Sequence, residues 1–390
     1  MGCGYPGKKM RGHIRRRGER SWEIKFDLGV DPVTGKRETR YASVKGTKRE
    51  AQAKLAELIA SVASGSHIDT SKITVAEFVR ARIDQWEASG DITALTAQRY
   101  RQLTENQIVP FIGAMVLQKV RPLHIERWHT ELRIKGRADG EGGIAARTIG
   151  HAHRVLSSAL SDAAENDLVL RNVMQSKSPP KVPDEEMIIV RDVPALIAEI
   201  KVSGRSLYVP AMVSLFTGMR RSEVLALRWS RVDLDRKMIE VREALEFTKA
   251  HGIRFKAPKS KAGRREITLP DVLVDVLCDY RKAQLELRMK LGTGKLHDKD
   301  LLFADIDGAP LSPSSVSAAW SNYAKQIGMP EVTFHSLRHT HASQLIDQNV
   351  DIVTISKRLG HAKPDITLRI YAHLFRKDDR KAADAINAIF

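Results

Sequence analysis

The stretch that decides the fold reads TFHSLRHTHAS and spans residues 333–343. His335 and Arg338 stand three positions apart, a spacing that places both side chains on one face of a helix. The neighbouring histidines His339 and His341 raise the question of a metal site. However, no Asp, Glu or Cys accompanies them at ligand spacing, and we expect His339 to point away from the face that His335 and Arg338 share. The sequence therefore predicts a site with no metal and no cofactor.

A second informative stretch, LFTGMRRSEVLAL, lies upstream at residues 215–227. Gly218 is expected to end one helix and Arg220 to begin the next. An arginine at such a position can point its guanidinium at a phosphate beside the free helix amides. On its own, an arginine followed by Glu223 more often caps a helix or forms an ion pair.

The third informative stretch lies downstream. Gly360 predicts the end of a helix and places His361 in the turn that follows. Tyr371 stands ten positions further on, within or beside a short helix. A single tyrosine in such a context usually packs in a core, so none of these residues is informative alone.

Taken together, the residues form the ordered pattern R…HxxR…GH…Y, each with its own flanking sequence. This pattern, made by Arg220, His335, Arg338, His361 and Tyr371, resembles the tyrosine recombinase family, the phage and transposon integrases. The resemblance covers roughly residues 185–390. It implies a site-specific DNA recombinase that integrates or excises a phage or mobile element through a 3′-phosphotyrosine intermediate, without ATP or metal.

The resemblance also implies a role for each of these residues. Tyr371 would be the nucleophile, and because a phenol has a pKa of about 10 it needs positive surroundings and a proton acceptor, for which His335 is the candidate. The two arginines, Arg220 and Arg338, would stabilise the non-bridging phosphate oxygens through bidentate contacts. His361 would hydrogen-bond the phosphate.

A carboxylate and a serine complete this expectation. Glu223 is expected to support the fold of the site and not to react. Ser336 stands where many integrases have Asp, a departure that affects only the local hydrogen bonds.

The leaving 5′ oxygen needs a proton, which family members take from a lysine on the turn between the second and third strands. Lys259 is the candidate, because Pro258-Lys259-Ser260 is similar to the family's frequent Pro-Lys-Thr. Lys261 remains the alternative. The lysine that does not act would be part of a solvated basic hairpin that touches phosphate.

Charge independently favours a nucleic-acid partner. The chain has 64 Lys and Arg against 47 Asp and Glu, and basic side chains that neutralise phosphates release counterions. Residues 1–66 hold 15 of the basic residues against 7 acidic ones, nearly half of the excess. We therefore expect double-stranded DNA, with its attachment sites, as the partner.

Three parts are expected, giving a multidomain, α-rich α+β fold. Residues 1–66 should form an arm-type DNA-binding domain, a small three-stranded sheet with one helix that opens at the Thr47 capping box. Residues 72–177 should form an all-α, SAM-like core-binding domain, and residues 187–390 a mixed α/β catalytic domain. The first two assignments rest on domain order and size.

Local patterns predict the elements within these parts. Helices are expected near residues 75–88, 94–109, 121–134 and 147–166. Short strands of one antiparallel sheet are expected near 237–243, 253–257 and 265–269.

Four basic side chains of the first part are candidates for DNA contact: Arg15, Arg16, Arg17 and Lys25. The alternative is that they are solvated charges that protect exposed strand edges.

Two other functions compete with recombination. A topoisomerase would share the tyrosine chemistry, but the basic first part and the chain length favour recombination. A DNA-binding regulator would be expected to lose catalytic residues, and every expected position is filled.

The resemblance further implies a homotetramer in the synaptic complex, in which residues 381–390 dock on a neighbouring subunit; folding back on their own core is the alternative. A host DNA-bending protein and an excisionase are expected accessory partners. The expected location is the cytoplasm of a bacterial host, at the nucleoid, with no membrane association.

Overall fold

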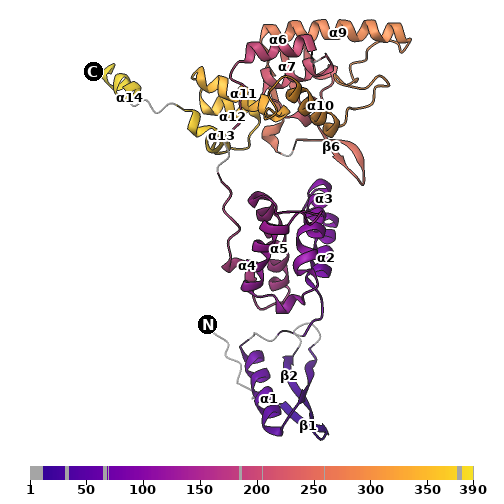
Figure 1. Ribbon diagram of the computed structural model, residues 1–390, viewed down its shortest axis with the longest axis vertical. Helices are drawn as coiled ribbons and strands as arrows, with labels where there is room; N and C mark the ends of the chain where they lie inside the picture. The colour runs from indigo at the N-terminus through magenta and orange to yellow at the C-terminus, as the bar shows by residue number, and fades with distance from the viewer. Residues whose placement is uncertain are drawn as a thin grey trace. The chain divides into compact units, whose positions relative to one another are not determined.

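The structure is a computed structural model. It describes residues 12–30, 35–64, 68, 70–183, 187–203, 205–258, 260–375 and 380–389. The chain divides into two compact units, Met1–Val182 and Pro183–Phe390, each of which is described by itself (Figure 1). None of the described helices has both the length and the apolar character needed to cross a membrane.

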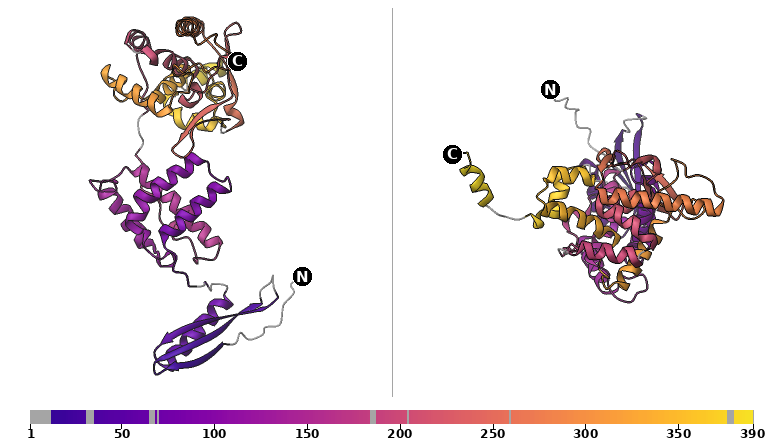
Figure 2. Two further views of the ribbon diagram at one scale, coloured as in Figure 1. Left: turned by 90° about the vertical axis from the view of Figure 1, so that its right-hand side faces the viewer. Right: turned by 90° about the horizontal axis from the view of Figure 1, so that it is seen from above.

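The first unit begins with a three-stranded antiparallel sheet in the order β1-β2-β3. Its strands are β1 (Gly12–Gly18), β2 (Ser21–Val30) and β3 (Arg37–Lys45). Alternation along β2 buries Ile24 and Phe26 on one face. Helix α1 (Lys48–Ala63) lies along that face (Figure 2). The helix opens with the predicted capping box, in which Thr47 and Glu50 exchange hydrogen bonds.

The rest of the first unit is helical, as predicted. Its main helices are α2 (Val75–Ala88), α3 (Ala94–Leu103), α4 (Pro122–Lys135) and α5 (Ala146–Glu165), with the π-helical segment η1 (Thr104–Gly113) after α3. They enclose one apolar core in which the large ring of Trp128 is 1% exposed. The indole nitrogen of Trp128 donates to the carbonyl of Gln107 at 2.6 Å, so the buried polar group is satisfied.

The second unit is a helical assembly with two small sheets. Its helices are α6 (Val193–Ser203), α7 (Tyr208–Thr217), α8 (Arg221–Val224), α9 (Asp271–Leu291), α10 (Pro313–Gln326), α11 (Phe334–Asp347), α12 (Ile352–Leu359), α13 (Pro364–Tyr371) and α14 (Arg380–Asn387). One sheet has the order β4-β5-β8, with β4 (Val232–Asp233), β5 (Met238–Val241) and β8 (Arg265–Thr268). The other is the hairpin of β6 (Ala244–Thr248) and β7 (Gly252–Lys256).

The predicted fold class is confirmed, but the predicted arrangement of strands was wrong in one respect. The sequence led us to expect one sheet that includes a strand near residues 253–257. In the structure that strand, β7, pairs with β6, which was not predicted. Residues 244 and 245 are both buried, so β6 lacks the alternation that marks a half-buried strand.

Helix α7 ends where the structure requires a glycine. Gly218 caps the helix with φ of 67°, a left-handed conformation. A Cβ there would lie 2.7 Å from Cδ2 of His341 and 2.7 Å from Cδ2 of Leu359. The chain can therefore turn toward Arg220 only if this position has no side chain.

We expect Gly218→Ala to destabilise the chain more than its matched control, Gly292→Ala. Gly292 caps α9 with the same φ of 67°, but a Cβ there would meet nothing within 4 Å. Left-handed backbone costs an alanine roughly 1–2 kcal/mol, and overpacking at Gly218 should add roughly 1–3 kcal/mol. Urea unfolding followed by tryptophan fluorescence measures both variants, and equal losses would contradict the packing argument.

Candidate active site

Arg338 is the buried centre of the site. It lies on α11 with 2% of its surface exposed. Its Nη1 donates to the carbonyl of Gly218, at the end of α7. Its Nη2 donates to the carbonyl of Leu359, at the end of α12, at 2.8 Å, and to Nε2 of His361 at 2.9 Å. One guanidinium thus joins the ends of two helices and the turn that follows the second.

The surroundings of Arg338 favour the binding of an anion. Burial, and then the positive charge of Arg220, lower the pKa of Arg338 to about 9, so the side chain still carries its charge at neutral pH. Its acceptors are carbonyls and a neutral ring, none of which cancels a full charge. A phosphate would supply the missing negative charge.

Arg220 contributes a second guanidinium from the start of α8. Its backbone and Nη1 donate to the carboxylate of Glu223, at 3.0 Å and 2.8 Å. Its Nη2 is 3.5 Å from the carbonyl of Gly360. The side chain is 38% exposed, so it can reach a ligand from solvent while Glu223 fixes its base.

Glu223 lies where the sequence placed a supporting carboxylate. It is 3% exposed and also accepts from Nη2 of Arg265 at 2.9 Å. Burial raises its pKa, but Arg265 and then Arg220 outweigh burial, and the net pKa is lowered. The carboxylate is therefore charged and orients two arginines.

His361 lies in the turn after Gly360, as predicted from the glycine. Because an arginine can only donate, Nε2 of His361 accepts from Arg338, and its Nδ1 then carries the hydrogen and donates to Oγ1 of Thr367 at 2.6 Å. Burial, then Arg338 and Arg220, lower the pKa of His361 to about 4. In this arrangement His361 orients Arg338, and Nε2 must gain a proton before it can donate to a phosphate.

Tyr371, the predicted nucleophile, is the last residue of α13 and is 1% exposed. Its hydroxyl lies 2.8 Å from Nδ1 of His339. Burial raises the pKa of Tyr371 to about 12, although the positive charges of Arg338 and Arg220 act in the opposite direction. The phenol is therefore protonated at neutral pH and needs help to attack.

The expectation that His339 points away from the site was wrong. Residues four apart on a helix share a face just as residues three apart do, and the rings of His335 and His339 lie 4.7 Å apart. His339 is therefore a site residue that the sequence analysis missed. His335, the predicted proton acceptor, is exposed and lines a hollow of about 390 Å³ with Arg220 and Arg221.

Two other residues of this helix have structural contacts. Nδ1 of His341 donates to the carbonyl of Leu215, and its Nε2 accepts from Arg358 at 3.0 Å, so neither nitrogen is available to a metal. Ser336, which stands where many integrases have Asp, accepts from the backbone of Thr333 at 3.1 Å and completes the capping box of α11.

Of the two candidate lysines, the structure describes only Lys261. Lys259 lies outside the described residues. Lys261 is exposed in the turn η6 (Lys261–Gly263). A hollow of about 590 Å³ adjoins this turn and is lined by Arg220, His361 and Lys256 among others. Lys256 at the end of β7, which the sequence analysis did not consider, forms an ion pair with Glu246.

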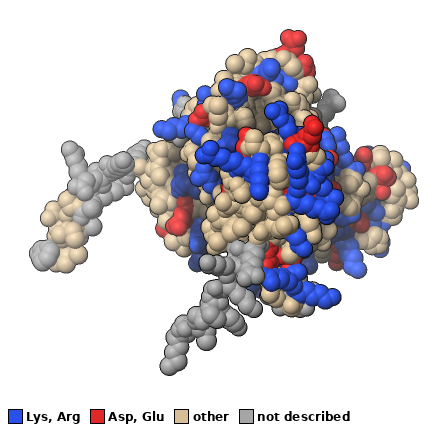
Figure 3. Space-filling view, turned by 90° about the horizontal axis from the view of Figure 1, so that it is seen from below, with Lys and Arg blue, Asp and Glu red and all other residues tan. Residues whose placement is uncertain are grey.

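The basic residues predicted to contact DNA in the first unit do not share one surface. Arg15 and Lys25 are exposed on the sheet face away from α1. Arg17 reaches the same face, where it forms an ion pair with Glu23 at 2.8 Å. Arg16 lies on the opposite face and donates to backbone carbonyls. Figure 3 shows Lys and Arg side chains spread over much of one face of the molecule.

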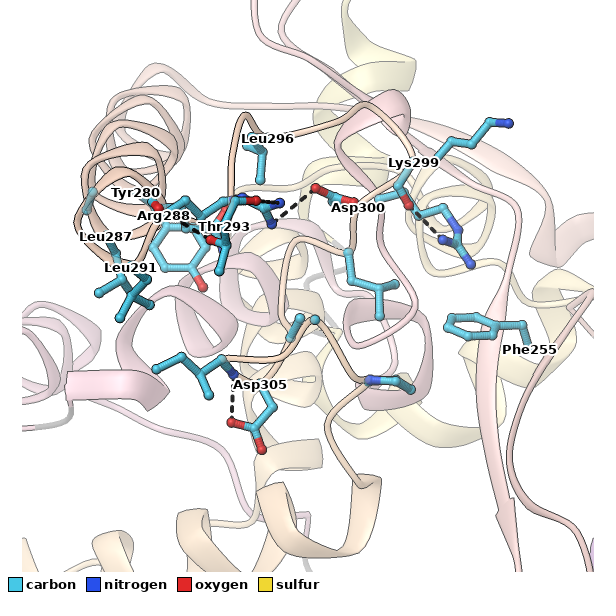
Figure 4. A pocket seen from close by; sticks show the side chains of 18 residues that line it. Phe255, Tyr280, Leu287, Arg288, Leu291, Thr293, Leu296, Lys299, Asp300 and Asp305 are labelled. Carbon is cyan, nitrogen blue, oxygen red and sulfur yellow. Dashed lines mark hydrogen bonds and ion pairs between the residues drawn. The ribbon is translucent and has the colours of Figure 1, made fainter.

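A separate hollow of about 550 Å³ lies beside α9 (Figure 4). Tyr280, Leu287 and Leu291 line it from the helix, and Phe255 of the hairpin lines the other side. Among the described residues, none of those predicted to act on DNA lines this hollow.

Comparison with known proteins gives a consistent result. The model of the phage integrase family matches residues 188–378, and that of the phage integrase N-terminal SAM-like domain matches residues 80–133. An integrase of Streptomyces ambofaciens is 28% identical over 95% of this chain and 93% of its own. A tyrosine recombinase XerC-like protein of Caldanaerobacter subterraneus is 24% identical over 88% of this chain and 90% of its own.

Solved structures share the fold. The Tn1549 transposon integrase (residues 82–397) in complex with transposon right end DNA has a TM-score of 0.67 at 17% identity, covering 81% of this chain and 100% of that chain. A lambda integrase dimer bound to a core site has a TM-score of 0.54 at 16% identity, covering 96% of this chain and 97% of that one. Family models match segments of both units, and the pattern R…HxxR…GH…Y is present. The chain therefore belongs to the phage integrase family of tyrosine recombinases.

Proposed function

We propose that this chain is a site-specific DNA recombinase that integrates or excises a mobile element through a 3′-phosphotyrosine on Tyr371. One observation carries the proposal: the guanidiniums of Arg220 and Arg338 meet at the turn of Gly360 and His361. The hydroxyl of Tyr371 contacts His339, the residue that follows Arg338 on α11. The relatives named integrase, from bacteria and their mobile elements, agree with it.

The chemistry follows from these groups. The phenolic oxygen of Tyr371 forms a bond to phosphorus while the bond from phosphorus to the 5′ oxygen breaks. Arg338 and Arg220 stabilise the charge that develops on the non-bridging oxygens, which is the main difficulty in attacking a phosphodiester. A lysine of the turn after β7 gives a proton to the leaving 5′ oxygen. Reversal of the same steps with another 5′ hydroxyl rejoins the strand, and the ester to tyrosine keeps the energy of the original bond.

The burial of Tyr371 implies a movement before attack. A hydroxyl on a side chain that is 1% exposed cannot meet a DNA phosphate until the segments that cover it shift. The packing of Tyr371 against Ile355 and Leu359 holds the resting arrangement. DNA binding must therefore supply the free energy that exposes the nucleophile.

The partners follow from the reaction. Exchange between two duplexes needs four active sites, so we propose a homotetramer in the synaptic complex; a lambda integrase tetramer bound to a Holliday junction is a structural neighbour. The apolar side of α14, with Ile386 at 57% exposed, is the proposed contact to a neighbouring subunit. A host DNA-bending protein and an excisionase are proposed accessory partners. The proposed place of action is the nucleoid of a bacterial host.

Tyr371→Phe should abolish covalent attachment to DNA and leave DNA binding unchanged, because only the nucleophilic oxygen is removed. The sequence of the attachment site is first determined from the junctions of the integrated element. Covalent product is then measured as an SDS-resistant protein–DNA band on DNA that carries this site. Tyr323→Phe is the matched control, since Tyr323 is also buried and its hydroxyl also meets a side chain, that of Ser203 at 2.9 Å. Adducts that persist in Tyr371→Phe would refute the assignment of the nucleophile.

The general acid can be identified with a leaving group that needs no proton. Lys259→Ala is expected to slow cleavage of ordinary DNA roughly 100-fold or more. With DNA that has sulfur in place of the scissile 5′ oxygen, the same variant should cleave at nearly the wild-type rate, because a thiolate leaves unaided. Lys261→Ala and Lys256→Ala serve as matched comparisons, and rescue confined to either of them would reassign the role.

A further inference from the structure

The nearest partner of the Tyr371 hydroxyl is a histidine that the sequence analysis left out. Nδ1 of His339 lies 2.8 Å from the phenolic oxygen, within hydrogen-bond distance. The two rings have centroids 5.7 Å apart and planes inclined by 59°. His335, which the family pattern singles out, is one turn earlier on α11, and its ring contacts that of His339.

The protonation state of His339 suits it to accept a proton. Burial, then the neighbouring His335 and Arg338, lower the pKa of His339 to about 4, so the ring is neutral at neutral pH. A neutral imidazole has one donor nitrogen and one acceptor nitrogen. With the hydrogen on Nε2, Nδ1 is the acceptor and faces the phenolic hydrogen directly.

The ring of His339 contacts an exposed histidine of the same helix. The ring of His335 meets that of His339 edge to face, with centroids 4.7 Å apart. His335 is exposed and lines the hollow of about 390 Å³ that it shares with Arg220 and Arg221. Tyr371 itself is 1% exposed, so its hydroxyl is shielded from solvent.

We propose that His339 is the first acceptor of the Tyr371 proton and that His335 relays this proton to solvent. As the bond between the phenolic oxygen and phosphorus forms, the phenolic proton moves to Nδ1 of His339. The bond to the 5′ oxygen breaks at the same time, and that oxygen takes its own proton from the lysine of the turn. The inference rests on the proposed function and assigns the proton acceptor within it.

The energetics are consistent with transfer during attack and not before it. With no phosphate present, a phenol of pKa about 12 does not give its proton to an imidazole of pKa about 4. A phosphate anion bound by Arg338 and Arg220 raises the pKa of the nearby imidazole, because it favours the protonated ring. The phenol also becomes more acidic as its oxygen bonds to phosphorus. The charged and titratable groups that face this pair are His335, Arg338 and Arg220.

The test replaces His339 with residues that distinguish two roles: binding the Tyr371 hydroxyl and accepting its proton. In His339→Asn the amide oxygen can still meet the hydroxyl, but it cannot take up a proton. His339→Ala leaves a space that added imidazole can enter. The substrate is attachment-site DNA with sulfur in place of the scissile 5′ oxygen, so that the lysine does not affect the rate.

We expect His339→Asn to form covalent product roughly 100-fold more slowly than wild type, with unchanged DNA binding and thermal midpoint. Imidazole should restore a substantial part of the rate of His339→Ala, and more basic imidazoles should restore more. His335→Asn should also be slowed, and His297→Asn, an exposed histidine of the same unit, should match wild type.

Three results would overturn the inference. One is cleavage by His339→Asn within twofold of wild type while His335→Asn is slow, which returns the role to His335. Another is a slow His339→Ala that no imidazole restores, which makes His339 a positioning residue only. The third is a slow His339→Asn whose DNA binding or thermal midpoint has fallen with it. Failure of the proposed function is distinct, since wild type itself would then form no covalent product.

Discussion

The site depends on the hydrogen bonds of a buried guanidinium to carbonyl groups that end two helices. Arg338 donates to the carbonyls of Gly218 and Leu359. Arg220 lies two residues after Gly218, and His361 lies two residues after Leu359. Hydrogen bonds to a charged group contribute roughly 1.5–3 kcal/mol each. The same contacts therefore stabilise the fold and fix the positions of the second arginine and the histidine, which are proposed to bind a phosphate.

The charges of this region are balanced only when an anion is present. Arg220, Arg265 and Arg338 lie around one buried carboxylate, Glu223, so positive charge is in excess. Removing a charge from water is costly unless it is paired, and a bound phosphate pairs it. The excess positive charge that destabilises the empty site would therefore stabilise the negative charge that develops on a phosphate in the proposed reaction. Burial has the opposite effect on Tyr371, the proposed nucleophile, because it raises the pKa of the phenol and keeps it protonated.

Local chemistry explains which features could be predicted from the sequence. The glycines that end helices at 218 and 360, and the capping box at Thr47, depend on a few neighbouring residues, and the structure has them where they were expected. The helices of the first unit follow in the same way from periodicity. The fold class was predictable for this reason.

The errors concern contacts between distant segments or a face that was misjudged. Whether Tyr371 meets His335 or His339 depends on how α13 packs on α11, which no local pattern encodes. The exclusion of His339 neglected that the fourth residue along a helix returns to the same side. Strand β6 was missed because its partner and its burial are set by the hairpin. The division of Arg15 and Arg16 between two faces follows directly from strand alternation and could have been foreseen.

The central claim is that Tyr371 attacks a phosphate held by the arginines of its own chain. It is tested most directly by mixing two inactive variants, Tyr371→Phe and Arg220→Ala, on attachment-site DNA and measuring covalent protein–DNA product. The account predicts no product in the mixture, because neither chain has both the nucleophile and both guanidiniums. Recovery of covalent product on mixing would show that the tyrosine is delivered to another subunit's arginines and would contradict it.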